Sequence, residues 1–230
     1  MPDATLTCID FWIKAGSKYE RAGEEGLAHF LEHMLFKGGL NLKAGDFDRE
    51  IESLGGSSNA ATGFDDVHYY VLVPHDAVEI ALEHLINLVL NPSFEPGEFR
   101  TEREVVLEEI AQNKDQPDEQ IIKILLEMCW GNHPYGKPIL GDKKSLLKMS
   151  PEDMEEFHQR RYNSNNFTIA IAGKIPNNLE KILNKRLAGP TLNLSAKQDQ
   201  NEYLKNVYFN IERREIEVQR LESSRLIMAW

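Results

Sequence analysis

The residues of this chain that are best suited to chemistry are two histidines and a glutamate in the run His29-Phe-Leu-Glu-His33. On a helix, residues four apart lie on the same face, so both imidazoles can reach one metal ion. Glu32 lies beside that ion without having to bind it. Two imidazoles and an adjacent carboxylate can hold zinc and supply a general base to the water that zinc activates. The spacing H-x-x-E-H is the inverted form of the H-E-x-x-H motif.

The same run also fits an amphipathic helix that carries two histidines by chance, because the chain contains seven histidines and many acidic residues. Its apolar positions cover much of the helix surface, which indicates a largely buried helix. Histidine and glutamate side chains on a buried helix need polar partners, and a bound metal ion meets that need. We therefore favour a metal site. The apolar positions are Leu27, Phe30, Leu31, Met34 and Leu35.

A catalytic zinc site takes three protein ligands and one water molecule, so a third ligand is required. The cysteines do not suit this role, because Cys8 and Cys129 lie far apart and the chain has no C-x-x-C spacing. Carboxylates are the better source. Residues 95–110 are rich in glutamate, and Pro96 near their start is typical of the first turn of a helix.

Two glutamates of this predicted helix, Glu102 and Glu109, are seven residues apart and share one face, two turns from each other. Val105, Val106 and Ile110 give the same region apolar character. A glutamate on a buried face needs a cation as partner. Periodicity alone does not separate Glu109 from Glu108, so both remain candidates at this point.

The motifs resemble the pitrilysin, insulysin and mitochondrial processing peptidase family of inverted-motif zinc peptidases, in particular its N-terminal catalytic half. The resemblance rests on His29-Phe-Leu-Glu-His33 followed by Glu102-Arg-Glu-Val-Val-Leu-Glu-Glu-Ile110. It implies one zinc ion per chain, with His29, His33 and Glu109 as ligands, Glu32 as general base and Glu102 as a supporting acid. It extends over about residues 4–175 and includes the segments 15–20, 55–62, 133–136 and 162–173.

The segment 57–62 consists of small residues that have little to pack, which by itself fits a weak strand or a loop. The resemblance implies that this segment is the edge strand that holds an extended substrate peptide. Asn59, Ala60 and Ala61 are then the expected substrate-binding residues. Backbone hydrogen bonds to a sheet edge require no particular substrate sequence, which fits a peptidase with several substrates.

Composition narrows the possible partners and compartments. With 230 residues, 41% of them hydrophobic, the chain can bury a sizeable core. It has no apolar run of 18 residues and no secretory signal at Met1, so we expect no membrane span. A formal charge of −11 disfavours nucleic acid and anionic membranes as partners. Two distant cysteines fit the reducing cytoplasm, or an organelle matrix or stroma after removal of a targeting segment.

The order of the predicted elements favours an α+β fold, with an antiparallel or mixed sheet and helices packed on one side of it. No linker marks a boundary, so we expect one domain over residues 1–230. Strands are expected at 5–13, 57–62, 67–73 and 167–172, with further strand-like runs towards Trp230. Besides the helix that carries the histidines, helices are expected at 45–54, 76–90, 96–113, 117–130, from Ser150 onward and at 179–187.

These features predict a zinc-dependent endopeptidase that hydrolyses peptides, presequences or oligopeptides. The resemblance implies a second, similar half that closes over the substrate, and nothing after Phe167 is long enough to form it. We therefore expect a fragment, or one half that needs a partner subunit and is weakly active alone. Two alternatives stay open: a non-catalytic binding or assembly module related to the peptidases, and a zinc hydrolase of non-peptide substrates.

Overall fold

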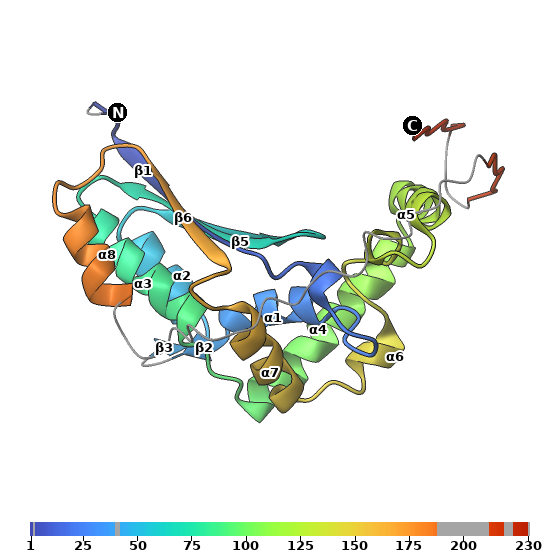
Figure 1. The fold of residues 1–230 in the computed structure, drawn as a ribbon, viewed down its shortest axis with the longest axis horizontal. Coiled ribbons are helices and arrows are strands. Elements are labelled where there is room, and N and C mark those ends of the chain that lie inside the picture. The colour runs from blue at the N-terminus through green and yellow to red at the C-terminus, as the bar shows by residue number, and fades with distance from the viewer. Residues whose placement is uncertain (2, 40–41, 188–211, 219–222, 230) are drawn as a thin grey trace.

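The strands of this chain alternate between buried and more exposed residues, as expected for a sheet with one covered face. A computed structural model describes residues 1, 3–39, 42–187, 212–218 and 223–229. Figure 1 shows a twisted sheet with helices gathered on one side of it. The predicted α+β class is confirmed.

The main sheet has four strands in the order β4-β5-β1-β6, and all neighbours are antiparallel. Strand β6 pairs with β1 although the two are more than 150 residues apart in the chain, so the last of these strands closes onto the first. In the part of the chain that the structure describes, β4 pairs only with β5 and forms an edge. The strands are β1 (Leu6–Ile13), β4 (Ser57–Thr62), β5 (Val67–Pro74) and β6 (Phe167–Ala172).

Helices and short turns make up the second layer. None of the helices in the described ranges is both long and apolar enough to span a bilayer. A hairpin of two-residue strands, β2 (Gly38–Gly39) and β3 (Leu42–Lys43), follows the first helix. The helices are α1 (Leu27–Leu35), α2 (Asp46–Ser53), α3 (Val78–Leu90), α4 (Pro96–Lys114), α5 (Pro117–Trp130), α6 (Lys143–Leu146), α7 (Pro151–Arg161) and α8 (Leu179–Leu187), with 3₁₀ turns η1 (Ser17–Tyr19) and η2 (Pro134–Gly136).

The hydrophobic core lies between the covered face of the sheet and helices α1, α3 and α7. Inward residues of β1 and β5, such as Phe11 and Val71, are fully buried there. The core also contains one polar pair, because the hydroxyl groups of Tyr69 and Tyr162 lie 2.9 Å apart and satisfy each other. The sheet and helices are thus joined mainly by apolar packing.

Helix α1 begins where Gly26 and Glu20 together satisfy its first turn. Gly26 has φ of 94°, and a Cβ at this position would lie 2.6 Å from the carbonyl oxygen of Leu140, so only glycine fits. The carboxyl group of Glu20 accepts hydrogen bonds from the N–H groups of Gly26 (3.1 Å) and Ala28 (2.8 Å). Burial raises the pKa of Glu20 to about 8, although these two donors act to lower it. The side chain of Glu20, six residues before Gly26, therefore stabilises the start of α1.

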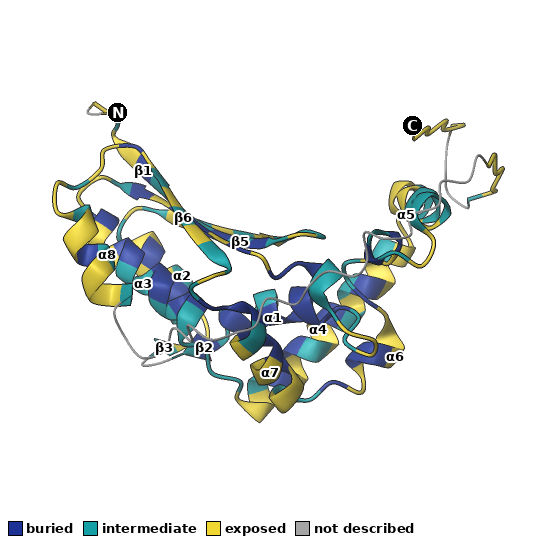
Figure 2. Ribbon diagram, in the orientation of Figure 1, coloured by how far each residue is buried: buried dark blue, intermediate teal, exposed yellow. Residues whose placement is uncertain are grey.

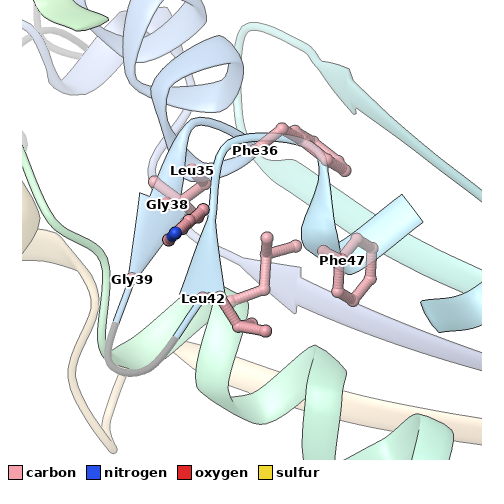
Figure 3. A pocket seen from close by; sticks show the side chains of 8 residues that line it. Leu35, Phe36, Gly38, Gly39, Leu42 and Phe47 are labelled. Carbon is pink, nitrogen blue, oxygen red and sulfur yellow. The ribbon is translucent and has the colours of Figure 1, made fainter. Parts of the chain in front are cut away.

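A small pocket lies where the β2–β3 hairpin meets the end of α1, as Figure 3 shows. Its volume of about 10 Å³ is close to the minimum for one water molecule, and its walls are mainly apolar. This pocket is a packing gap and too small for a ligand. The labelled residues that line it are Leu35, Phe36, Gly38, Gly39, Leu42 and Phe47.

The strands and helices expected from the sequence are found within two residues of their predicted bounds. The short hairpin β2–β3 and the one-turn helix α6 were not predicted, because such short elements carry no periodic signal. The strand-like runs expected towards Trp230 fall largely outside the described residues. The described stretches 212–218 and 223–229 form neither helix nor strand.

The buried histidine of α7, His158, is expected to make the fold sensitive to acid. Its Nε2 lies 2.9 Å from the carbonyl oxygen of Val89, and burial lowers its pKa from 6.5 to about 4. Below pH 6.5 His158 is protonated in the unfolded chain, whereas in the folded chain it stays neutral down to about pH 4. The free energy of unfolding therefore falls as the pH drops towards 4. Between pH 7 and 4.5 this loss amounts to about 2.5 kcal/mol.

Denaturant titrations of the parent and of His158→Gln at pH 7 and 4.5 measure this contribution. Glutamine keeps an N–H donor for Val89 and does not titrate, so the variant should lose less stability on acidification than the parent. Parallel losses in the two proteins would show that His158 is not the group responsible.

Candidate metal centre

Helix α1 carries the motif into an enclosed position between strand β4 and helices α4 and α7. None of its nine residues is exposed, as the colouring of α1 in Figure 2 shows. Its apolar residues face the core, which leaves the polar side chains on the side towards α4 and β4. His29 keeps only 8% of its surface exposed. The motif histidines are therefore largely withdrawn from water and need partners inside the protein.

Glu109 of α4 approaches both histidines of α1. Its Oε2 lies 3.7 Å from Nε2 of His29 and 3.5 Å from Nε2 of His33. One ligand atom from each of the three residues falls within 4.8 Å of the others. A tetrahedral zinc ion with bonds of about 2.0–2.1 Å sets its ligand atoms about 3.4 Å apart. The donor types and their spacing therefore fit a zinc ion.

Glu102, two turns earlier on α4, supports this cluster from behind. Its Oε1 lies 2.8 Å from Nδ1 of His33, and its Oε2 forms an ion pair of 2.8 Å with Nζ of Lys37. Burial acts to raise the pKa of Glu102, but His33 and Lys37 outweigh that effect and lower it below its ordinary value. An ionised Glu102 accepts the Nδ1–H of His33, which turns the Nε2 lone pair towards Glu109.

The two histidines differ in their electrostatic surroundings. Burial, with a contribution from His33, lowers the pKa of His29 to about 4, so its imidazole is neutral near pH 7. Burial also opposes the charge on His33, but Glu102 and Glu109 more than offset it and raise the pKa of His33. Nδ1 of His29 is buried without a hydrogen-bond partner among the described residues. A metal ion at Nε2 would give this buried imidazole a strong partner.

Glu32 faces the same space without joining the three-ligand cluster. Its carboxylate accepts a hydrogen bond from the hydroxyl group of Thr62, the last residue of β4. Burial raises the pKa of Glu32 above its ordinary value, with a further contribution from Glu109. A carboxylate with a raised pKa beside a candidate metal site has the properties of a general base.

The cluster opens into a cleft with a volume of about 530 Å³. One wall contains His29, Glu32 and Glu109 together with Ala60, Ala61 and Thr62 of edge strand β4. Asn59 does not line the cleft, and its Oδ1 instead accepts a hydrogen bond of 2.9 Å from the N–H of Ala60. The cleft is also lined by residues of α5 and of the segment after η2, including Ile122, Lys123, Leu126, Lys137, Pro138, Ile139 and Leu140.

The structure thus gathers the predicted residues His29, Glu32, His33, Glu102 and Glu109 at one place. It also separates the two neighbouring glutamates that periodicity left open, because Glu109 lies against both histidines whereas Glu108 is exposed.

Sequence reasoning missed Thr62 and Lys37. Thr62 gave no signal, because its contact with Glu32 joins residues 30 positions apart. Lys37 gave no local signal either, because it lies beyond the end of α1 and its partner Glu102 is 65 positions away in the chain.

This sequence matches two known protein families over successive segments. Residues 2–143 match the family described as Insulinase (Peptidase family M16), and residues 148–230 match the Peptidase M16 inactive domain. The second match includes β6, which pairs with β1 from the first, so both matched segments contribute to one sheet. The first match alone covers more than half of the chain.

Individual relatives agree with the family match. An uncharacterized zinc protease of Rickettsia bellii is 37% identical over 175 residues, which are 76% of this chain and 42% of that protein. A probable mitochondrial-processing peptidase subunit beta of Arabidopsis thaliana is 32% identical over 193 residues, covering 82% of this chain and 36% of that protein. A crystal structure of a protease from Helicobacter pylori superposes with a TM-score of 0.80 and 27% identity, covering 90% of this chain and 49% of that one.

The chain spans less than half the length of each of these relatives. The fold, the clustered histidines and glutamates, and the matches over both parts of the sequence lead to one conclusion. This chain belongs to the insulinase family, peptidase family M16.

Proposed function

We propose that residues 1–230 form the catalytic half of a zinc-dependent endopeptidase. The observation that carries this proposal is the approach of Glu109 Oε2 to Nε2 of both His29 and His33, at a spacing that suits one zinc ion. The relative from Rickettsia bellii is named a zinc protease, which supports the same activity for the longer protein. A peptide is the substrate class that such an enzyme requires.

His29, His33 and Glu109 would hold the zinc ion, which leaves room for a water molecule as the fourth ligand. Bound zinc would lower the pKa of that water towards about 7 and polarise the carbonyl group of the substrate. Glu102 acts through His33, because its hydrogen bond to Nδ1 keeps Nε2 available.

Glu32 is the general base of the proposed reaction. Its carboxylate removes a proton from the attacking water and then delivers that proton to the amine that leaves. Thr62 holds one oxygen of Glu32 through its hydroxyl group, and Glu32 lines the cleft. Burial of Glu32 brings its pKa closer to neutrality, which favours both halves of this proton transfer.

The substrate would lie along edge strand β4 as an added strand. Ala60 and Ala61 line the cleft beside Glu32, so a peptide paired with them passes close to the metal cluster. The N–H of Ala60 donates to the side chain of Asn59, and an added strand would take over this donor. Asn59 would then shield this donor in the absence of substrate.

The rest of the longer protein would supply a second half that covers the cleft, either in the same polypeptide or in a partner subunit. The relative from Arabidopsis thaliana is named as a subunit of a processing peptidase, which fits such pairing. The charge of −11 argues against nucleic acid or an anionic membrane as partner. We place the protein in the cytoplasm, or in an organelle matrix or stroma.

Two observations favour this function over the alternatives. A non-catalytic assembly module would have no need for Glu32 beside two histidines and Glu109. A zinc hydrolase of small non-peptide substrates would have no need for a free strand edge along its cleft.

Zinc content tests the ligand set. Elemental analysis of the purified parent chain should find close to one zinc ion per chain. His33→Ala and Glu109→Gln should each lose it, because two remaining ligands bind zinc weakly. Glu108→Gln is the matched control: it removes the same charge from the next position of α4 and should keep the zinc. Loss of zinc in the control as well would reject Glu109 as the specific ligand.

Glu32→Gln tests the general base. The variant should bind zinc like the parent, because Glu32 is outside the ligand cluster, yet its peptide hydrolysis should fall by about 10²-fold or more. Hydrolysis of a fluorogenic peptide library by the longer protein measures this. Glu104→Gln, on an exposed position of α4, should leave the rate unchanged. Undiminished turnover by Glu32→Gln would contradict the mechanism.

The 230-residue chain by itself should bind zinc but cleave peptides slowly, because one wall of the cleft is open to solvent without the second half. Steady-state kinetics of the zinc-loaded chain, with and without the remainder of the protein, measure this difference. Rapid and saturable hydrolysis by the chain alone at low concentration would show that no second half is needed.

A further inference from the structure

Lys37 reaches from the end of α1 to the carboxylate that supports the metal cluster. It lies two residues after α1, and its Nζ is 2.8 Å from Oε2 of Glu102. The other oxygen of Glu102, Oε1, is 2.8 Å from Nδ1 of His33. Lys37, Glu102 and His33 therefore form a continuous polar chain that ends at the ligand atom Nε2 of His33.

The burial of Glu102 makes its two partners important. Its side chain is only 6% exposed, whereas the side chain of Lys37 is 33% exposed. Each carboxylate oxygen of Glu102 has one cationic or N–H partner, one on each side. Removal of Lys37 would leave Oε2 buried without that partner, which costs free energy and permits the carboxylate to turn away from His33.

The charges around the cluster also balance only when Lys37 is included. Glu32, Glu102 and Glu109 together carry three negative charges when ionised, and a zinc ion supplies two positive charges. Lys37 supplies the third, on the side of Glu102 that is opposite to His33. Its charge therefore compensates the supporting carboxylate without competing for the ligand atoms.

The backbone on both sides of Lys37 is held in place. Its N–H donates a hydrogen bond of 3.0 Å to the carbonyl oxygen of Met34 in the last turn of α1. Gly38, the next residue, has φ of 134° and begins strand β2 of the short hairpin. The backbone of Lys37 is thus held in place, which reduces the entropy lost when its side chain pairs with Glu102.

We propose that Lys37 is a positioning residue of the metal centre. It holds the Glu102 carboxylate in the orientation that accepts Nδ1–H of His33, and so keeps Nε2 of His33 directed at the metal. This inference rests on the proposed zinc site. It adds a residue outside the H-x-x-E-H motif to the set that determines zinc affinity.

Zinc affinity, measured by competition with a chromophoric chelator, tests the proposal in the 230-residue chain. Lys37→Met should weaken zinc binding about tenfold or more, in the range found when groups that orient metal ligands are lost. Lys37→Arg keeps a cation with N–H donors and should restore most of the affinity. Lys43→Met, at an exposed position of strand β3 in the same hairpin, is the matched control and should bind zinc like the parent.

A double-mutant cycle shows whether Lys37 acts through Glu102. In the Glu102→Gln background, the change Lys37→Met should alter zinc affinity less than about twofold, because the carboxylate that Lys37 orients is gone. An equal loss in both backgrounds would overturn the proposal. Unchanged zinc binding by Lys37→Met would also overturn it, because Lys37 would then have no effect on the site. Tighter binding would overturn it as well, because repulsion between the lysine and zinc would then be the dominant effect.

The outcomes separate this inference from the proposed function. A parent chain that binds no zinc contradicts the proposed metal site itself. A parent that binds zinc and a Lys37→Met variant with the same affinity contradict only the role of Lys37. Circular dichroism establishes that each variant is folded. If Lys37→Met does not fold, Lys37→Gln replaces it: affinity well below that of Lys37→Arg supports the proposal, and affinity equal to the parent overturns it.

Discussion

Helix α1 is enclosed by β4, α4 and α7, and it carries two histidines and a glutamate into that enclosed position. Polar groups in such a place must be paired, because an unpaired buried polar group costs several kcal/mol. The neighbouring elements provide the partners: α4 contributes Glu102 and Glu109, and β4 contributes Thr62. The arrangement of these elements around α1 is therefore also the arrangement of the site.

Helix α4 contacts the histidines of α1 twice, because its glutamates Glu102 and Glu109 are seven residues apart. Glu109 faces the Nε2 atoms of both histidines, and Glu102 faces the opposite nitrogen of His33. A single helix thus supplies one candidate ligand and a hydrogen-bond partner for another. Any shift of α4 relative to α1 would disturb both contacts together, which couples the apolar packing between these helices to the geometry of the metal centre.

The sheet places the cluster next to a free strand edge. Strand β4 contacts α1 and, among the described strands, pairs only with β5. Its other edge therefore remains open along the cleft. Thr62 connects that edge to Glu32 through one hydrogen bond. In the proposed reaction, the strand that would bind the peptide therefore also holds the carboxylate that would act as its base.

Much of this protein followed from its sequence alone. Local periodicity and capping residues predicted the helices and strands, since these signals act over a few residues. The spacing of His29, Glu32 and His33 on one helix predicted a metal site. Periodicity left Glu108 and Glu109 as alternatives, and within the sequence only the family resemblance pointed to Glu109. The tertiary structure gives the physical reason, because neighbouring residues of a helix point about 100° apart and Glu109 is the one that faces α1. Only the fold brought Thr62 to Glu32 and Lys37 to Glu102, because contacts between elements depend on how the core packs and leave no mark on local sequence.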